Sequence, residues 1–122
     1  MTLILVAEDD SHIRLLILRK LEGANYKVIV CENGDEALKF ALEKLPRLLL
    51  LDIMMPGLTG LQVCERVKQQ LGNKAPRVII VSARGEEADV VAAEKAGADD
   101  YLIKPFSPGE MLEHVKAVLG QS

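Results

Sequence analysis

Tryptophan is absent from this sequence of 122 residues, and aromatic residues of all kinds make up only 3% of it. A chain so poor in aromatic side chains offers few of the stacking surfaces on which single-stranded nucleic acids are bound. An excess of positive charge is also missing, because 15 basic residues face 18 acidic ones and the net charge is -3. We therefore expect this chain to make no direct contact with nucleic acid.

Long apolar runs are missing too, since none approaches the ~20 residues that a membrane helix needs. The N-terminus has no basic start and passes from the apolar run 3–7 straight into three acids, unlike a signal peptide. We expect a cytoplasmic protein without membrane association. Only two cysteines occur, Cys31 and Cys64, and both lie in apolar segments. We expect them to be reduced core residues rather than disulfide or zinc ligands.

Short apolar runs alternate with amphipathic stretches along the whole chain, which has the length of one domain, 1–122. The runs predict strands over 3–7, 26–31, 48–54, 77–82 and 101–103. The stretches predict helices over 11–22, 35–45, 60–71, 86–96 and from 107 onward, with Ser11 and Ser107 as N-terminal caps. Regular alternation of this kind predicts an α/β fold with an open, doubly wound, five-stranded parallel sheet and five helices.

Polar residues follow four of the five predicted strands, at the points where the strands end. They are Glu8, Asp9 and Asp10, then Asp52, Ser82 and Lys104. Open α/β sheets bind their ligands beyond the carboxyl ends of the strands. We therefore expect these carboxylates, the hydroxyl and the ammonium to converge at one edge of the sheet.

The chemistry of this set favours a bound cation and a phosphoryl group. Neighbouring carboxylates repel one another unless a cation is present, and oxygen ligands beside an open position suit Mg²⁺. A lysine and a hydroxyl suit phosphoryl oxygens. The pattern thus fits a carboxylate that attacks phosphorus and becomes an aspartyl phosphate. Asp52 is the candidate, because it follows four leucines in a segment where an unpaired charge is costly to bury.

Each of these residues also has an ordinary explanation. The three acids fit a solvated turn in which an aspartate caps the next helix, Ser82 fits a helix cap, and Lys104 fits a surface lysine. Their occurrence together, at four strand ends, is what favours a site.

At this point the sequence resembles the receiver domain of two-component response regulators, most closely that of the winged-helix transcription-factor class. The matching stretches are ILVAEDD (4–10), LLDIMMPG (50–57), VSAR (81–84) and GADDYLIKPF (97–106). The resemblance implies a flavodoxin-like fold with strand order 2-1-3-4-5. It also implies a phosphoacceptor that takes its phosphoryl group from a sensor histidine kinase, supports only its own phosphorylation and dephosphorylation, and is not otherwise an enzyme.

The resemblance assigns a role to each residue at the strand ends. Asp52 would accept the phosphoryl group. Asp9, Asp52 and the backbone carbonyl of Met54 would bind Mg²⁺ directly, and Glu8 would do so through water. Ser82 and Lys104 would each contact a phosphoryl oxygen.

Further family features concern switching. The resemblance implies a cis peptide between Lys104 and Pro105, and Tyr101 occupies the aromatic switch position. Ser82 and Tyr101 would move together and remodel the face formed by the last two predicted helices and the strand between them. The same face pairs as a homodimer in the winged-helix class. The charged partners for that dimer are partly missing here, since the earlier helix is rich in valine and alanine and His114 stands where arginine is common, so such a dimer is a weaker expectation or a more apolar one.

A docking surface for the kinase is a further expectation. The helix at 11–22 carries more apolar residues than one face can bury, and the family docks partners near its start and at the loop after the last strand. The candidate contacts are His12, Ile13, Leu15, Leu18, Pro105 and Phe106. A broadly buried helix with one stray leucine is the ordinary alternative.

Two other functions remain open. An aspartyl-phosphate phosphatase of the haloacid dehalogenase type would carry a second aspartate two residues after its nucleophile, where this chain has Met54. A receiver-like module that binds partners without being phosphorylated is disfavoured by the intact set of Asp9, Asp52, Ser82 and Lys104.

Overall fold

The computed structural model describes residues 1–121, in which strands and helices alternate from one end to the other. The strands are β1 (Leu3–Ala7), β2 (Lys27–Cys31), β3 (Leu48–Asp52), β4 (Arg77–Ser82) and β5 (Asp100–Ile103). The helices are α1 (Ser11–Gly23), α2 (Gly34–Lys44), α3 (Gly60–Leu71), α4 (Glu87–Lys95) and α5 (Pro108–Val118), and a short 3-10 helix, η1 (Gly72–Lys74), follows α3. The strands form one parallel sheet in the order β2-β1-β3-β4-β5, which confirms the predicted fold.

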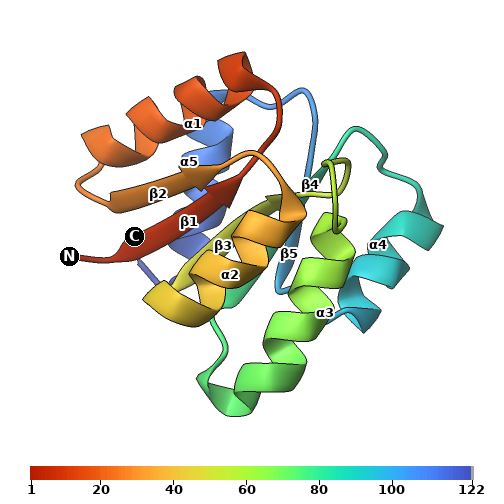
Figure 1. Cartoon of the computed structure of the whole chain (residues 1–122). Helices are drawn as coiled ribbons and strands as arrows, with labels where there is room; N and C mark the ends of the chain where they lie inside the picture. Colours follow the sequence, from red (N-terminus) through yellow and green to blue (C-terminus); the bar gives the residue numbers. More distant parts are fainter. Residues whose placement is uncertain (122) are drawn as a thin grey trace.

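The helices form a layer on each face of the sheet (Figure 1). Helices α1 and α5 cover one face, and α2, α3 and α4 cover the other. The leucines of the central strand β3 face both layers of helices. Leu49 and Leu51 pack into the core under α2, α3 and α4, whereas Leu48 and Leu50 pack into the core under α1 and α5. Because successive side chains of a strand point to opposite faces, a strand covered on both sides must be apolar throughout.

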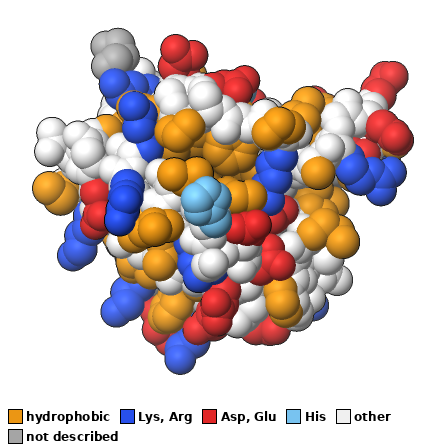
Figure 2. Space-filling view, turned by 90° about the horizontal axis from the view of Figure 1, so that it is seen from above, with side chains coloured by type: hydrophobic (Ala, Val, Ile, Leu, Met, Phe, Trp, Pro, Cys, Tyr) orange, Lys and Arg blue, Asp and Glu red, His pale blue; other side chains and the backbone are white. Residues whose placement is uncertain are grey.

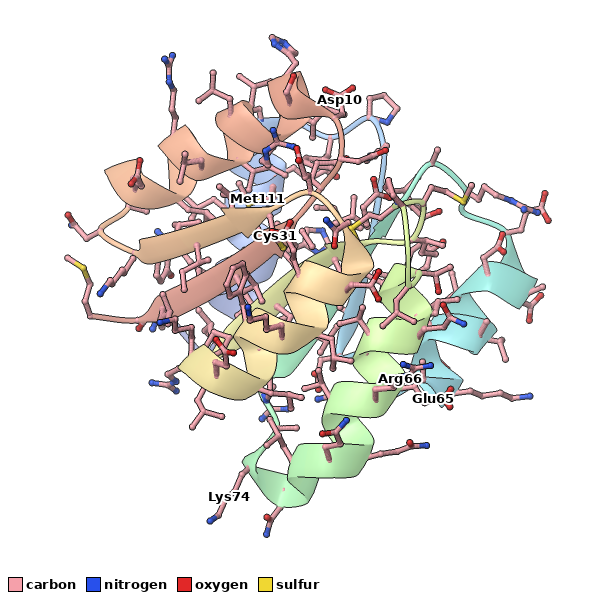
Figure 3. The ribbon with its side chains drawn as sticks, in the orientation of Figure 1. Asp10, Cys31, Glu65, Arg66, Lys74 and Met111 are labelled. Carbon is pink, nitrogen blue, oxygen red and sulfur yellow. The ribbon has the colours of Figure 1, made fainter. Side chains whose placement is uncertain are left out.

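Helix α1 begins at Ser11 as predicted, but its N-terminal cap is the preceding aspartate, as in the ordinary alternative for the three acids. Asp10, which lies at the start of α1 (Figure 3), is the N-terminal cap instead of Ser11. Its carboxylate accepts hydrogen bonds from His12 N and Ile13 N. The backbone of Asp10 is extended while Ser11 is already helical, so only Asp10 has the geometry of a cap. Ser107 caps α5 as predicted, accepting a hydrogen bond from Glu110 N.

The predicted third strand is two residues too long. It ends at Asp52, where Met54 N donates to Asp52 Oδ1 and the chain leaves the sheet. The loop then returns so closely that a side chain at Gly60 would collide with the backbone carbonyl of Asp52. This turn places Asp52 at the carboxyl edge of the sheet, facing the loops that follow β1, β4 and β5.

Two expectations about the core and the surface can be compared with the structure. Cys31 and Cys64 are both buried and free, as expected for reduced core residues. Within residues 1–121, no helix combines the length and the apolarity that a membrane crossing requires.

Candidate functional site

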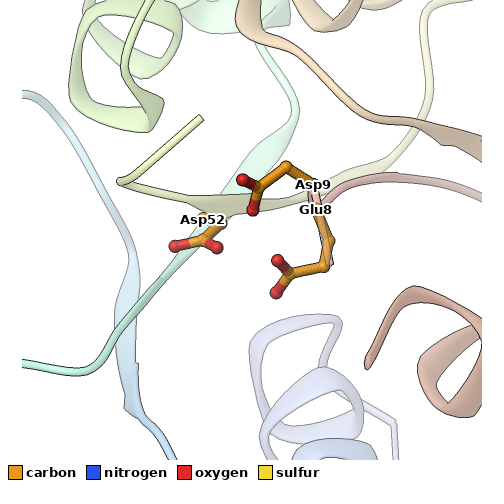
Figure 4. A group of neighbouring side chains, drawn as sticks. All are labelled: Glu8, Asp9 and Asp52. Atoms are coloured by element: carbon orange, nitrogen blue, oxygen red, sulfur yellow. The ribbon is translucent and has the colours of Figure 1, made fainter. Parts of the chain in front are cut away.

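Three carboxylates meet at the carboxyl edge of the sheet (Figure 4). Glu8 and Asp9 follow β1, Asp52 ends β3, and one oxygen from each lies within 4.8 Å of the others. Glu8 and Asp52 are only 2% and 5% exposed, whereas Asp9 is open to solvent. The predicted convergence of these three residues is thus present, with two acids inside and one at the rim. Asp10 has a different role, since it caps α1.

Lys104 joins the two buried acids. Its Nζ lies 2.8 Å from Glu8 Oε1 and 2.9 Å from Asp52 Oδ2. The residue is held just beyond β5 by a hydrogen bond from its backbone N to Ser82 O, and its peptide bond to Pro105 is cis, as the resemblance implied. A single ammonium therefore faces two carboxylates that are removed from water.

The pKa values of Glu8 and Lys104 reflect both their burial and their mutual contacts with Asp52. Burial, the largest cause, and the neighbouring Asp52 carboxylate together raise the pKa of Glu8 from 4.5 to about 7, against the opposing effect of the Lys104 ammonium. Burial alone would lower the pKa of Lys104, but its hydrogen bonds to Glu8 and Asp52 outweigh burial and raise it. A second cation at the open side, next to Asp9, would relieve the repulsion that remains.

The donor set fits Mg²⁺. Carboxylate oxygens of Glu8, Asp9 and Asp52 are hard ligands, and exposed Asp9 leaves one side accessible to water and to a ligand. Met54 turns its side chain to solvent, where it is 74% exposed, while its backbone N bonds Asp52 Oδ1 at 3.3 Å. Its backbone thus borders the site although its side chain does not, and the role of its carbonyl as a metal ligand stays a prediction.

Ser82 lies on the strand next to β3, in the register that pairs Asp52 with Val81. Its buried hydroxyl accepts a hydrogen bond from Arg84 N at 3.1 Å. The hydroxyl of Tyr101 in turn donates to Arg84 O, and the ring packs against the core under α2, α3 and α4. The backbone of Arg84 therefore connects the two predicted switch residues, a link that nothing in the sequence indicated.

The predicted docking residues are only partly brought together. Ile13, Pro105 and Phe106 line a small apolar cavity of about 160 Å³ between α1 and the loop after β5. Leu16, which sequence reasoning missed, lines it as well, because it lies one helical turn beyond Ile13. His12, Leu15 and Leu18 do not line this cavity, although His12 and Leu15 are exposed. From above, apolar, acidic and basic side chains are interspersed on this face of the molecule (Figure 2).

Comparison with known proteins places these features in a family context. The profile of the response regulator receiver domain matches residues 4–116. The chain is 47% identical over 118 residues to the transcriptional regulatory protein ResD of Bacillus subtilis, covering 97% of this chain and 48% of that protein. It is 42% identical over 119 residues to the alkaline phosphatase synthesis transcriptional regulatory protein PhoP of the same organism, covering 98% and 49%. The chain thus spans about half the length of these relatives.

Solved structures give the same fold. A putative response regulator from Chloroflexus aurantiacus superposes with a TM-score of 0.90 at 34% identity, covering 98% of both chains. A response regulator receiver domain protein from Methanospirillum hungatei, described as CheY-like, gives a TM-score of 0.91 at 28% identity, covering 98% of this chain and 94% of that one.

Proposed function

This chain belongs to the response regulator receiver domain family of two-component systems, and on that premise we propose that Asp52 accepts a phosphoryl group from a sensor histidine kinase. The observation that carries the proposal is the buried Asp52 carboxylate, which faces Lys104 and lies beside the acids Glu8 and Asp9. The relatives are named transcriptional regulators. We propose that this chain receives the signal and does not itself contact DNA.

The transfer is a single displacement at phosphorus. An Asp52 carboxylate oxygen forms the new bond to phosphorus while the bond to the histidine nitrogen of the kinase breaks, and that nitrogen keeps the electron pair. Lys104, already beside Asp52, pairs with a phosphoryl oxygen. The chain supports only this reaction and the later hydrolysis of the acyl phosphate, and it turns over no separate substrate.

Asp9, Asp52 and the backbone carbonyl of Met54 would hold Mg²⁺ directly, with Glu8 contributing through a water molecule. When bound, the ion supplies positive charge that offsets the charge of the phosphoryl oxygens. This assignment is supported by the three converging carboxylates, one of which, Asp52, adds to the effect of burial in raising the pKa of Glu8.

Phosphorylation would be relayed through Ser82. Movement of the Ser82 hydroxyl toward a phosphoryl oxygen would alter its hydrogen bond from Arg84 N, and the Arg84 backbone also holds the Tyr101 hydroxyl. A shift of this loop would therefore reach the face of α4, β5 and α5, where Val91 and Ile103 are exposed. We propose that this two-state change controls the output, including homodimerisation through that face.

The decisive test is incubation with Mg²⁺ and acetyl phosphate, followed by intact mass measurement. We expect a gain of one phosphoryl group in the parent protein and none in Asp52→Asn. Continuous release of phosphate from added phosphoesters would instead indicate a phosphatase. The absence of any mass gain, with this donor and with phosphorylated histidine kinases, would indicate a binding module and would refute the proposal.

A further inference from the structure

Arg14, in the first turns of α1, reaches back to the end of β1. Its Nη1 donates to the backbone carbonyl of Glu8 at 2.8 Å and approaches that of Asp9 at 3.4 Å. Its own backbone N bonds Asp10 O at 2.9 Å, so the helix fixes the base of the side chain. One half-buried guanidinium thus holds two consecutive peptide groups of the strand-to-helix turn.

These two peptide groups lie beyond the support of the sheet. The pairing of β1 with β2 ends at Ala7 and Cys31, and the last contact across it is from Glu8 N to Cys31 O at 3.1 Å. Arg14 donates to the carbonyls of both Glu8 and Asp9 there. The same two residues carry two of the three carboxylates of the candidate cation site.

We propose that Arg14 is a positioning residue for the cation site, an inference that rests on the proposed function. It contacts peptide carbonyls rather than carboxylates, so it fixes the backbone from which the Glu8 and Asp9 side chains extend toward Asp52. Among residues 1–121, Arg14 forms one ion pair, a contact of 3.7 Å with Glu32, which is two thirds exposed and contributes little. Arg14 therefore acts through geometry rather than through its charge.

A geometric role has a distinctive consequence for metal selectivity. Mg²⁺ requires a near-ideal octahedral arrangement of ligands, whereas Ca²⁺ accepts irregular ones. A loosened turn should therefore weaken Mg²⁺ binding more than Ca²⁺ binding. A general loss of stability would not change the ratio of the two affinities.

The experiment measures dissociation constants for Mg²⁺ and Ca²⁺ by NMR titration of the unphosphorylated protein. Arg14→Met keeps the length and helix propensity of the side chain but removes its donors. We expect it to weaken Mg²⁺ binding about tenfold, in the range found when residues that orient metal ligands are replaced, and to weaken Ca²⁺ binding clearly less. Arg14→Lys should stay close to the parent protein, because one nitrogen makes both carbonyl contacts.

Two matched variants serve as controls. Glu32→Gln removes the ion-pair partner of Arg14, and Arg19→Met makes the same replacement at an exposed position of α1. Neither should alter the affinity for either ion. If Arg14→Met fails to fold, the dissociation constants for Mg²⁺ and Ca²⁺ are measured for Arg14→Gln instead.

Equal losses for the two ions, or no loss, would overturn the assignment of Arg14, as would a parent protein that binds no Mg²⁺. The proposed phosphorylation is tested separately by mass. A parent protein that binds Mg²⁺ but gains no phosphoryl group would refute phosphorylation and leave the role of Arg14 standing.

Discussion

The ammonium of Lys104 lies 2.9 Å from the Asp52 carboxylate, so the proposed phosphoacceptor is already paired with a cation in this structure. The same ammonium contacts Glu8 at 2.8 Å. One positive charge thus neutralises part of a pocket that contains two buried acids and a third at its rim.

Lys104→Met should destabilise the protein by roughly 3 kcal/mol in the absence of Mg²⁺, the usual loss when one partner of a buried ion pair is removed. Glu8 and Asp52 would then face each other without their cation. Mg²⁺ should recover part of this loss, and the gain in stability on adding the ion should exceed that of the parent protein. Urea unfolding with and without Mg²⁺ measures both effects.

Lys95→Met, an exposed replacement on α4, is the control and should leave both quantities unchanged. In the double variant with Asp52→Asn, removing Lys104 should cost less than it does alone, since one repelling charge is gone. Additive losses in that double variant would mean that the ammonium does not stabilise the pocket electrostatically.

The titration of Glu8 should make the free energy of unfolding depend on pH. Its pKa is raised from 4.5 to about 7 in the folded state, chiefly by burial, so the folded protein binds a proton that the unfolded chain has released. The stabilisation is complete below about pH 4.5 and is lost as the pH rises through about 7. Without Mg²⁺, the free energy of unfolding should therefore decline across this interval.

Glu8→Gln tests the assignment, because glutamine cannot titrate. The decline between about pH 4.5 and 7 should flatten in this variant, measured by urea unfolding at successive pH values. Glu36→Gln, at an exposed position of α2, should leave the decline in place. A slope that persists in Glu8→Gln would assign the titration to another group.

Tyr101→Phe keeps the ring in the core and removes only the hydrogen bond to Arg84 O. We expect a loss of about 1 kcal/mol and faster amide hydrogen exchange in the loop between β4 and α4. Tyr26→Phe is the matched control, because that hydroxyl donates to Gln121 at the far end of the molecule. It should leave exchange in this loop unchanged, and equal exchange in both variants would mean that Tyr101 does not restrain the loop.

The strands and the residues at their ends could be predicted from local sequence patterns. Contacts between residues far apart in the chain could not. The four leucines of β3 and the acids beside them follow from strand periodicity and from the rule that ligands bind at the carboxyl edge. The contact of Lys104 with Glu8 joins residues 96 positions apart in the chain, and only the strand order brings them together. Asp10 rather than Ser11 is the cap because the backbone of Asp10 is extended while Ser11 is already helical, and both residue types are favoured at caps.

The apolar cavity between α1 and the loop after β5 shows the same limit. Helical periodicity identified an excess of apolar residues, but only the tertiary packing shows that Leu16, rather than Leu15 or Leu18, borders Phe106 and Pro105 there. The role of Arg14 was hidden for a similar reason, because its guanidinium contacts a backbone carbonyl six residues earlier across the strand-to-helix turn.

If this cavity receives the kinase, Leu16→Ser should slow phosphotransfer from a phosphorylated histidine kinase several-fold and leave the rate with acetyl phosphate unchanged. The reason is that Leu16 lines the apolar cavity beside Phe106 and is not one of the three clustered carboxylates. The residues proposed to carry out the phosphorylation are therefore unchanged in this variant. Rates with the two donors are measured by the appearance of the phosphorylated mass. Leu45→Ser, an exposed leucine at the opposite edge of the sheet, should affect neither rate. Equal slowing with both donors would show that Leu16 supports the fold of the site rather than the approach of the kinase.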